Sequence, residues 1–159
     1  MSIREISVLF ICLGNICRSP MAEAAFVNLI NNKNLESRFK VDSAGLIGYH
    51  AGESPDERTV RTCLKHDVPV KHTARKIVKQ DFLDFDYILC MDNSNLRELM
   101  KMQSKVKGPK AIVKLFGEYD PLGVKIIEDP YYGGMDDFEK NFQQVTRCSE
   151  AFLQSLELA

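Results

Sequence analysis

The 159-residue chain lacks tryptophan, has only three histidines and contains an odd number of cysteines, five. The cysteines show no paired spacing of the kind that indicates a disulfide framework, so we expect a reducing compartment, the cytoplasm. His50, His66 and His72 have no close cysteine partners. Since this is not the spacing of metal ligands, we expect neither a metal nor another cofactor.

The sequence also lacks a charge excess and a long apolar run. Its formal net charge is −1 at pH 7, which argues against a nucleic-acid-binding protein because such proteins usually carry a basic surface. No stretch approaches the ~18 apolar residues of a membrane span. The apolar run from Ile6 to Leu13 follows Glu5 and is soon followed by Arg18, so we interpret it as a buried strand and not as a signal peptide.

The composition and the alternation of patterns predict one α/β domain over residues 1–159. Hydrophobic residues make up 45% of the chain and charged residues 27%, which is ordinary for a domain with a real core. Short apolar runs alternate with helical patterns, which predicts a three-layer αβα fold with a four-stranded parallel sheet. The predicted strands are Ile6–Ile11, Phe39–Asp42, Tyr87–Met91 and Ala111–Phe116.

Four longer helices are expected between and after these strands. The first runs from Ser19, as a cap with Pro20 in the first turn, to Asn31. Ser54 to Glu57 has the pattern of a capping box with proline at the first helical position, followed by a core face of Val60, Cys63 and Leu64. Asp92 or Ser94 caps the third helix, and Asp136 with Glu139 caps the last.

Residues 12–20 combine a strand end, a tight loop and a helix start. Leu13 to Cys17 forms the loop, in which Gly14 and Asn15 tolerate positive φ. Such a loop points successive backbone N–H groups inward, and the helix N-terminus adds partial positive charge. We therefore predict an anion-binding loop directly after the first strand.

Cys12 and Arg18 give this loop a chemical function. N–H donors and a guanidinium stabilise a thiolate, which is the nucleophilic form of cysteine. The same donors bind a phosphate, and Arg18 offers two parallel hydrogen bonds to its oxygens. The arrangement predicts phosphoryl transfer to sulfur. The alternative is a buried structural cysteine beside a surface arginine.

The run Val-Leu-Phe-Ile-Cys-Leu-Gly-Asn-Ile-Cys-Arg-Ser-Pro, residues 8–20, resembles the signature of low-molecular-weight protein tyrosine phosphatases. Asp-Pro-Tyr-Tyr-Gly, residues 129–133, resembles the acid loop of that family. The resemblance implies hydrolysis of phosphotyrosine in proteins, and of aryl phosphates, through a phosphocysteine on Cys12. It implies that Arg18 binds phosphate and that Asp129 is the general acid and base. From its position alone, Asp129 could equally be an ordinary surface aspartate before a proline. It also implies inhibition by phosphate-like oxyanions and possible acid phosphatase activity.

Other residues receive roles from the same resemblance. The predicted phosphate loop comprises Leu13, Gly14, Asn15, Ile16, Cys17 and Ser19. Ser43 and His72 are expected to hold Asn15 in a left-handed conformation. Asp92 either joins this network or only caps the next helix. Ser19 either donates its hydroxyl to the Cys12 sulfur or is a plain helix cap.

Aromatic residues and a second cysteine complete the predicted site. Tyr49, His50, Tyr131 and Tyr132, with Leu13 and Ile16, are candidates for a slot that holds an aromatic ring, although each can instead be an ordinary surface residue. Cys17 is expected to trap oxidised Cys12 as a disulfide, or else it fills the core at the helix start.

Two rival functions are weighed against a phosphatase. An arsenate reductase of the same fold needs a cysteine relay after the third strand, but Cys90 lies within that strand and the next cysteine is Cys148. A phosphoprotein-binding module without activity would lack the nucleophile or the acid, and both are present. The sequence therefore favours the phosphatase.

Overall fold

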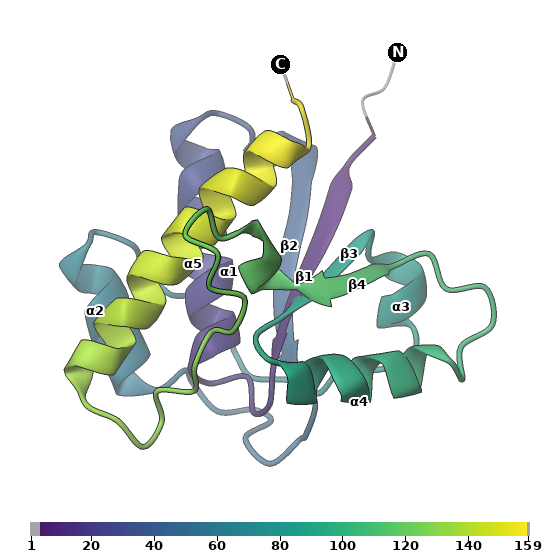
Figure 1. Cartoon of the computed structure of the whole chain (residues 1–159), viewed down its shortest axis with the longest axis horizontal. Coiled ribbons are helices and arrows are strands. Elements are labelled where there is room, and N and C mark those ends of the chain that lie inside the picture. The colour runs from purple at the N-terminus through teal and green to yellow at the C-terminus, as the bar shows by residue number, and fades with distance from the viewer. Residues whose placement is uncertain (1–3, 159) are drawn as a thin grey trace.

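The computed structural model describes residues 4–158, and Figure 1 shows a central sheet with helices on both faces. Within these residues the sheet has four parallel strands in the order β2-β1-β3-β4. This confirms the predicted three-layer α/β fold. Residues 1–3 and 159 of the predicted domain lie outside the described residues. The strands are β1 (Ile6–Cys12), β2 (Phe39–Gly45), β3 (Tyr87–Cys90) and β4 (Ile112–Leu115).

Helices cover the two faces of the sheet unequally. The first, second and last helices lie together on one face, and the two middle helices lie on the other (Figure 1). Within the described residues none of the helices is both long and apolar enough to cross a membrane. The helices are α1 (Arg18–Asn32), α2 (Glu57–Lys65), α3 (Asp81–Asp84), α4 (Asn93–Gln103) and α5 (Met135–Ser155), with 3-10 turns η1 (Glu36–Arg38) and η2 (Phe116–Tyr119).

Strand β1 is buried on both faces, which explains its continuous apolar sequence. Val8 and Phe10 pack in the core under α1 and α5, whereas Leu9 and Ile11 pack in the core under α3 and α4. Each such side chain stabilises the fold by roughly 1.5–3 kcal/mol through burial. Because side chains alternate along a strand, Cys12 shares the face of Phe10 and points toward α1.

The starts of three helices differ from the sequence-based predictions. Helix α2 begins at Glu57, not at Pro55, because the Asp56 carboxylate accepts a hydrogen bond from the Arg58 N–H at 2.8 Å and acts as the cap. Helix α1 begins at Arg18, so the prediction of Ser19 as its cap was wrong. Helix α5 begins at Met135, and its cap was also wrongly predicted. The Asp137 carboxylate, and not Asp136 with Glu139, accepts the hydrogen bond from Gly134 N–H at 3.2 Å.

Smaller differences concern strand lengths and surface positions. Strand β2 extends three residues beyond Asp42 because pairing with β1 continues to Gly45. Leu64 is 55% exposed and does not face the core as predicted. The sequence analysis did not identify α3 or the two 3-10 turns, which are too short to show a helical period.

Candidate active site

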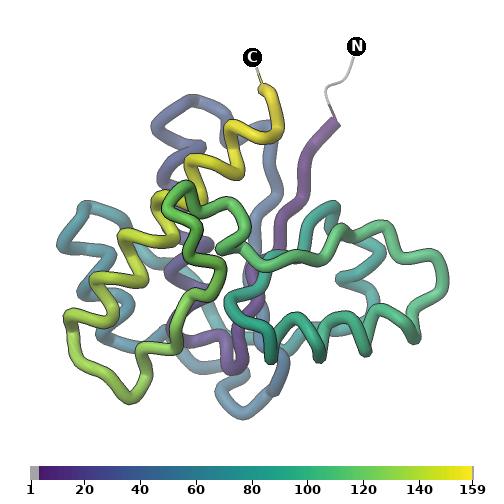
Figure 2. The backbone as a smooth tube through the Cα atoms, viewed as in Figure 1, coloured from purple at the N-terminus to yellow at the C-terminus, as the bar shows by residue number. Residues whose placement is uncertain are grey.

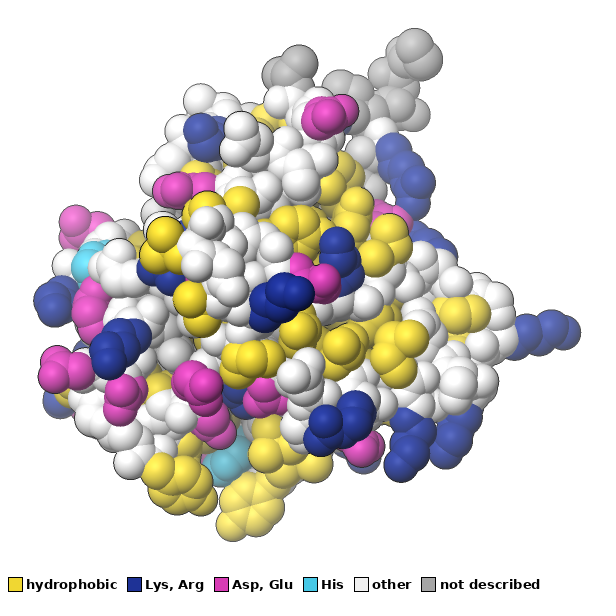
Figure 3. Space-filling view, viewed as in Figure 1, with side chains coloured by type: hydrophobic (Ala, Val, Ile, Leu, Met, Phe, Trp, Pro, Cys, Tyr) yellow, Lys and Arg dark blue, Asp and Glu magenta, His cyan; other side chains and the backbone are white. Residues whose placement is uncertain are grey.

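Three loops meet at the carboxyl end of the sheet, as the backbone trace shows (Figure 2). They follow β1, follow β2 and precede α5. Their side chains enclose a cavity of about 270 Å³, and hydrophobic groups project at this lower edge of the molecule (Figure 3). The cavity is lined by Cys12, Leu13, Gly14, Ile16, Cys17, Arg18, Ile47, Tyr49, His50, Asp129, Tyr131 and Tyr132. The rule that ligands bind beyond the carboxyl ends of parallel strands therefore locates this cavity correctly.

Asn15 is the buried centre of the loop after β1 and has a left-handed φ of 61°. Its side-chain amide donates to Ser43 Oγ at 3.0 Å and to Ser19 Oγ at 2.8 Å. Its Oδ1 lies 2.6 Å from His72 Nε2 and accepts a hydrogen bond from Arg75 N–H at 3.0 Å. The structure thus brings the expected Ser43 and His72 onto Asn15. The contact with Arg75 was not foreseen because a backbone N–H leaves no sequence signal.

The Cys12 sulfur lies at the floor of the cavity, and the residue is only 3% exposed. Asn15 N–H donates to Sγ at 3.3 Å, and Ser19 Oγ lies 3.0 Å from the same sulfur. Such donors stabilise negative charge on sulfur. Of the two alternatives for Ser19, the structure supports contact with the sulfur, since the hydroxyl makes no capping bond to α1.

Arg18 borders the same cavity with a side chain that is 4% exposed. Its Nη1 donates to Asp92 Oδ2 and to the Ile127 carbonyl, both at 2.8 Å. Asp92 also accepts a hydrogen bond from Asn95 N–H at 2.8 Å and caps α4. Asp92 therefore caps the helix, as one of the two alternatives from the sequence expected, and it does not join the network of Asn15, Ser43 and His72. It also orients the arginine, a role that the sequence analysis did not foresee.

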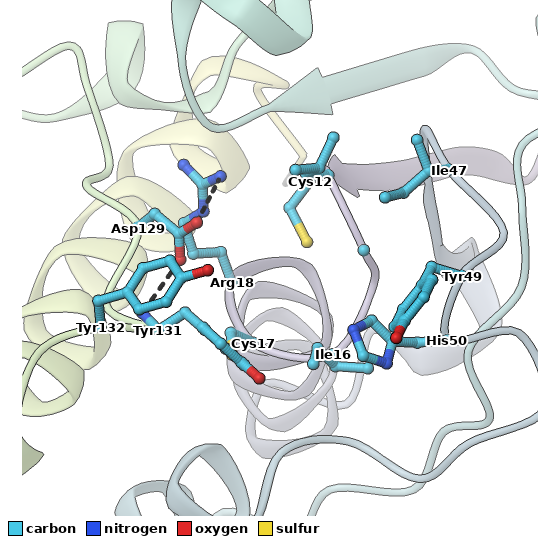
Figure 4. Close-up of a pocket in the computed structure, with 12 residues that line it drawn as sticks. Cys12, Ile16, Cys17, Arg18, Ile47, Tyr49, His50, Asp129, Tyr131 and Tyr132 are labelled. Carbon is cyan, nitrogen blue, oxygen red and sulfur yellow. Dashed lines mark hydrogen bonds and ion pairs between the residues drawn. The ribbon is translucent and has the colours of Figure 1, made fainter.

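Asp129 and the aromatic residues surround the sulfur from two sides (Figure 4). Asp129 Oδ2 lies 4.0 Å from Arg18 Nη2, and its Oδ1 accepts a hydrogen bond from Tyr131 N–H at 3.1 Å. Tyr49 and His50 lie across the cavity, opposite Asp129 (Figure 4). Tyr49 is 81% exposed and Tyr132 is 95% exposed, so both extend the rim of the cavity more than its floor.

Cys17 lies in the same loop and is 5% exposed. Burial raises the pKa of its thiol far above the usual range, and nearby Asp56 raises it further. Its carbonyl accepts a hydrogen bond from Thr59 Oγ1 at 3.2 Å. Cys12 and Cys17 are both free thiols, so the structure shows the reduced form of the predicted pair.

Glu23 and Asp42 support His72 from behind and were missed by sequence reasoning. His72 Nδ1 lies 3.1 Å from Glu23 Oε1, and Ser43 Oγ donates to the same oxygen at 2.6 Å. Burial raises the pKa of Glu23 to about 7. These side chains also have the composition of a metal site. However, the Arg75 guanidinium already binds Asp42 at 3.0 Å, and we assign the cluster no metal.

Comparisons with known proteins agree with this geometry. The family described as low molecular weight phosphotyrosine protein phosphatase matches residues 7–159. Proteins of that name from Homo sapiens and Saccharomyces cerevisiae are 53% and 51% identical over 148 and 154 residues. The human alignment covers 93% of this chain and 94% of the relative, and the yeast alignment covers 94% of each.

Solved structures give the same result. A protein tyrosine phosphatase from Entamoeba histolytica superposes with a TM-score of 0.89 at 34% identity, covering 96% of this chain and 97% of its own. A Drosophila arginine phosphatase superposes with a TM-score of 0.90 at 42% identity, covering 95% of this chain and 98% of its own. The chain therefore belongs to the low molecular weight phosphotyrosine protein phosphatase family.

Proposed function

We propose that this chain hydrolyses phosphotyrosine in proteins, and small aryl phosphates, through a phosphocysteine on Cys12. One observation carries the proposal. A buried cysteine sulfur, held by Asn15 N–H and Ser19, lies at the floor of a cavity that Arg18 and Asp129 border. A nucleophilic sulfur, a phosphate-binding fork and a proton donor are thereby present in one pocket.

In the first step the Cys12 sulfur attacks phosphorus and the bond to the tyrosine oxygen breaks. Arg18 and the loop N–H groups hold the phosphoryl oxygens, where charge is spread in the transition state. Asp129 donates a proton to the leaving phenolate, which makes it a better leaving group.

In the second step water attacks the phosphorus of the phosphocysteine. Asp129, now ionised, accepts a proton from that water as the new bond forms. The sulfur leaves as a thiolate, and the Ser19 hydroxyl, 3.0 Å from Sγ, stabilises it by hydrogen bonding. Phosphate is released and the resting enzyme is restored.

The cavity walls support an aromatic substrate. Leu13, Ile16, Ile47 and Tyr131 present apolar surface beside the sulfur, which suits the ring of phosphotyrosine better than the charged guanidinium of phosphoarginine. The Drosophila neighbour is named an arginine phosphatase. Both phosphoamino acids therefore belong in the first assay, and we expect faster turnover of phosphotyrosine.

Further proposals follow from the composition and the site. We propose a cytoplasmic enzyme, acting as one domain over residues 1–159 without nucleic acid or cofactor. We expect phosphate-like oxyanions to inhibit it, acid phosphatase activity on simple aryl phosphates, and redox control through Cys12 and Cys17. Arsenate reduction is not proposed, because Cys90 is fully buried and burial raises the pKa of its thiol to about 12.

The test compares Cys12→Ser with a matched control, Cys63→Ser, whose buried thiol lies on α2 and does not line the cavity. Mass spectrometry of the acid-quenched wild type should find phosphate on Cys12. The Cys12→Ser variant should lose turnover of phosphotyrosine, because a serine hydroxyl is barely ionised at neutral pH. Retained turnover in Cys12→Ser, or a phosphate on another residue, would contradict the proposal.

A further inference from the structure

The start of α2 joins the phosphate loop to the loop that carries Asp129. On one side, Asp56 N–H donates to the Ile16 carbonyl at 2.8 Å, and Thr59 Oγ1 donates to the Cys17 carbonyl at 3.2 Å. These two bonds fix the position of the first turn of α2 relative to the nucleophile loop. The side chain of Arg58 extends from the same turn to the other loop.

Arg58 is held at its base and contacts the acid loop with its guanidinium. Its Nε and Nη2 bind the two carboxylate oxygens of Asp56 at 3.1 and 3.0 Å, a bidentate pair. Its Nη1 donates to the Gly133 carbonyl at 3.3 Å. The guanidinium carbon lies 5.4 Å from the ring centroid of Tyr131 and 4.5 Å from that of Phe138, within the range of a cation–π interaction.

The chain on the two sides of Asp129 is held by different elements. Before Asp129, the Ile127 and Glu128 carbonyls accept hydrogen bonds from Arg18 and Asn141 at 2.8 and 3.0 Å. After Asp129, the contacts of Arg58 with residues 131 and 133 hold the chain. The Asp129 carboxylate accepts its hydrogen bond from the N–H of Tyr131. Its direction therefore depends on the half of the loop that Arg58 holds.

We propose that Arg58 is a positioning residue that fixes the carboxyl group of Asp129 over the Cys12 sulfur, acting through Tyr131 and Gly133. The inference rests on the proposed role of Asp129 as general acid. Arg58 itself lies outside the cavity lining. If the acid is misplaced, the rate falls more for a substrate with a poor leaving group than for one with a good leaving group, since only the poor leaving group needs the proton.

Arg58 contacts the acid loop as a charged guanidinium. Hydrogen bonding to Asp56 raises the pKa of the arginine above its usual high value. Although burial acts to raise the pKa of Asp56, the bonds from Arg58 hold it below its ordinary range. Both members of the pair are therefore ionised at neutral pH, and the leaving-group series is measured there without a change in the charge of Arg58.

The test measures kcat/KM for a series from phenyl phosphate to 4-nitrophenyl phosphate in Arg58→Gln and Arg58→Lys. The matched control is Arg61→Gln, because Arg61 lies on the same helix but pairs only with Glu57 among the described residues. We expect Arg58→Gln to lose about 10-fold on phenyl phosphate and less than about 3-fold on 4-nitrophenyl phosphate. Arg58→Lys should lie between Arg58→Gln and wild type, and Arg61→Gln should match wild type.

The same substitution in an Asp129→Ala background separates positioning from general structure. If Arg58 acts through Asp129, adding Arg58→Gln should change kcat/KM by less than about 2-fold there. Orthovanadate inhibition of the single variants should match wild type, since the phosphate loop is intact. If Arg58→Gln does not fold, Arg58→Lys, which keeps the positive charge beside Asp56, provides the comparison.

Two failures of the experiment are distinguishable. Equal losses across the phenol series in Asp129→Ala would overturn the general-acid role, and with it the basis of this inference. In the other case, Asp129→Ala loses more kcat/KM with the poorer leaving groups, as a general acid requires, but Arg58→Gln loses kcat/KM equally across the series. That result would overturn only the positioning role of Arg58.

Discussion

At the residue scale, Arg18 shows how a buried cation is made useful for binding phosphate. Its Nη1 is occupied by Asp92 and by the Ile127 carbonyl. These partners fix the plane of the guanidinium, and Nη2 lies on the side of Asp129 (Figure 4). A planar fork held in this way binds two phosphate oxygens with little further loss of side-chain entropy.

The first prediction concerns Arg18→Lys, which keeps the positive charge but removes the fork. An ammonium cannot bind Asp92, the Ile127 carbonyl and two phosphate oxygens in one plane. We expect kcat/KM on phosphotyrosine to fall at least ~10-fold, which corresponds to about 1.4 kcal/mol. The control is Arg61→Lys on the exposed face of α2, which should keep wild-type rates. A smaller loss in Arg18→Lys would mean that charge alone binds the phosphate.

Residues of the site differed in how far the sequence could predict them. Cys12 and Arg18 lie six positions apart and were recognisable because loop and helix are continuous in sequence. Asp129 required resemblance to a family, since an aspartate before a proline is common on surfaces. Arg58 and Glu23 could not be found, because their partners come from segments far apart in the chain.

At the scale of elements, the phosphate loop buries its second thiol, and this burial keeps the thiol protonated at neutral pH. Cys17 is the N-cap of α1, and its carbonyl is bonded to Thr59. Burial raises the pKa of this thiol far above neutral. Since a thiolate is the attacking species in disulfide formation, we expect the predicted trapping of oxidised Cys12 by Cys17 to be slow at neutral pH.

The redox prediction follows from this chemistry. Peroxide oxidises the Cys12 thiolate to a sulfenic acid, and Cys17 attacks that sulfur, forming a disulfide and releasing water. Peroxide is then removed with catalase, and disulfide formation is followed at several pH values. Its rate should rise about tenfold per pH unit near neutrality, because the fraction of Cys17 present as thiolate rises by the same factor. Peptide mapping measures the Cys12–Cys17 link, and dithiothreitol should restore activity.

The variant Cys17→Ser tests whether the second thiol protects the first. It should keep its activity but recover poorly after the same peroxide treatment, since a sulfenic acid without a partner oxidises further. Cys148→Ser, at a buried thiol on α5, serves as the control. Full recovery of Cys17→Ser would mean that Cys17 only fills space at the start of α1.

Elements as a whole were predictable where a period repeats and less so at their ends. The strands and α1, α2, α4 and α5 follow from apolar spacing. The start of α2 does not follow from the sequence, because Ser54 and Asp56 are both good caps. Only the observed hydrogen bond from Arg58 N–H to Asp56 decides between them. Turns such as η2 are set by packing against α5, which local sequence does not encode.

At the scale of the whole molecule, the long segment before α5 is attached to that helix along its length. Gln144 donates to the Val124 and Ile126 carbonyls at 2.9 and 3.1 Å. Asp120 forms two bonds with Arg147, at 3.1 and 3.0 Å, and its own side chain is completely buried. The fold thus holds a segment without regular structure through polar contacts with one helix.

This attachment predicts how stability depends on pH. Although burial acts to raise the pKa of Asp120, the bonds from Arg147 and from Leu122 N–H hold it below its ordinary value. A carboxyl group whose pKa is lower in the folded state stabilises the protein above the unfolded-state pKa, near 3.9. That stabilisation is lost as the pH falls through the lower folded-state pKa.

We therefore expect Asp120→Asn to lower the free energy of unfolding at pH 7 by on the order of 2 kcal/mol, because the charged Arg147 loses its partner. The difference from wild type should shrink as the pH falls below about 4, because the Asp120 carboxyl group then begins to protonate in the unfolded wild-type chain while it stays ionised in the folded one. Urea unfolding across pH 3–7 measures both curves. The control is Asp136→Asn, which replaces an exposed carboxylate on α5, the helix that carries Arg147. Its curve of unfolding free energy against pH should run parallel to that of wild type. If the Asp120→Asn curve also runs parallel to wild type, then the Asp120–Arg147 pair contributes no pH-dependent stability, and the apolar contacts of η2 and α5 hold the segment in place.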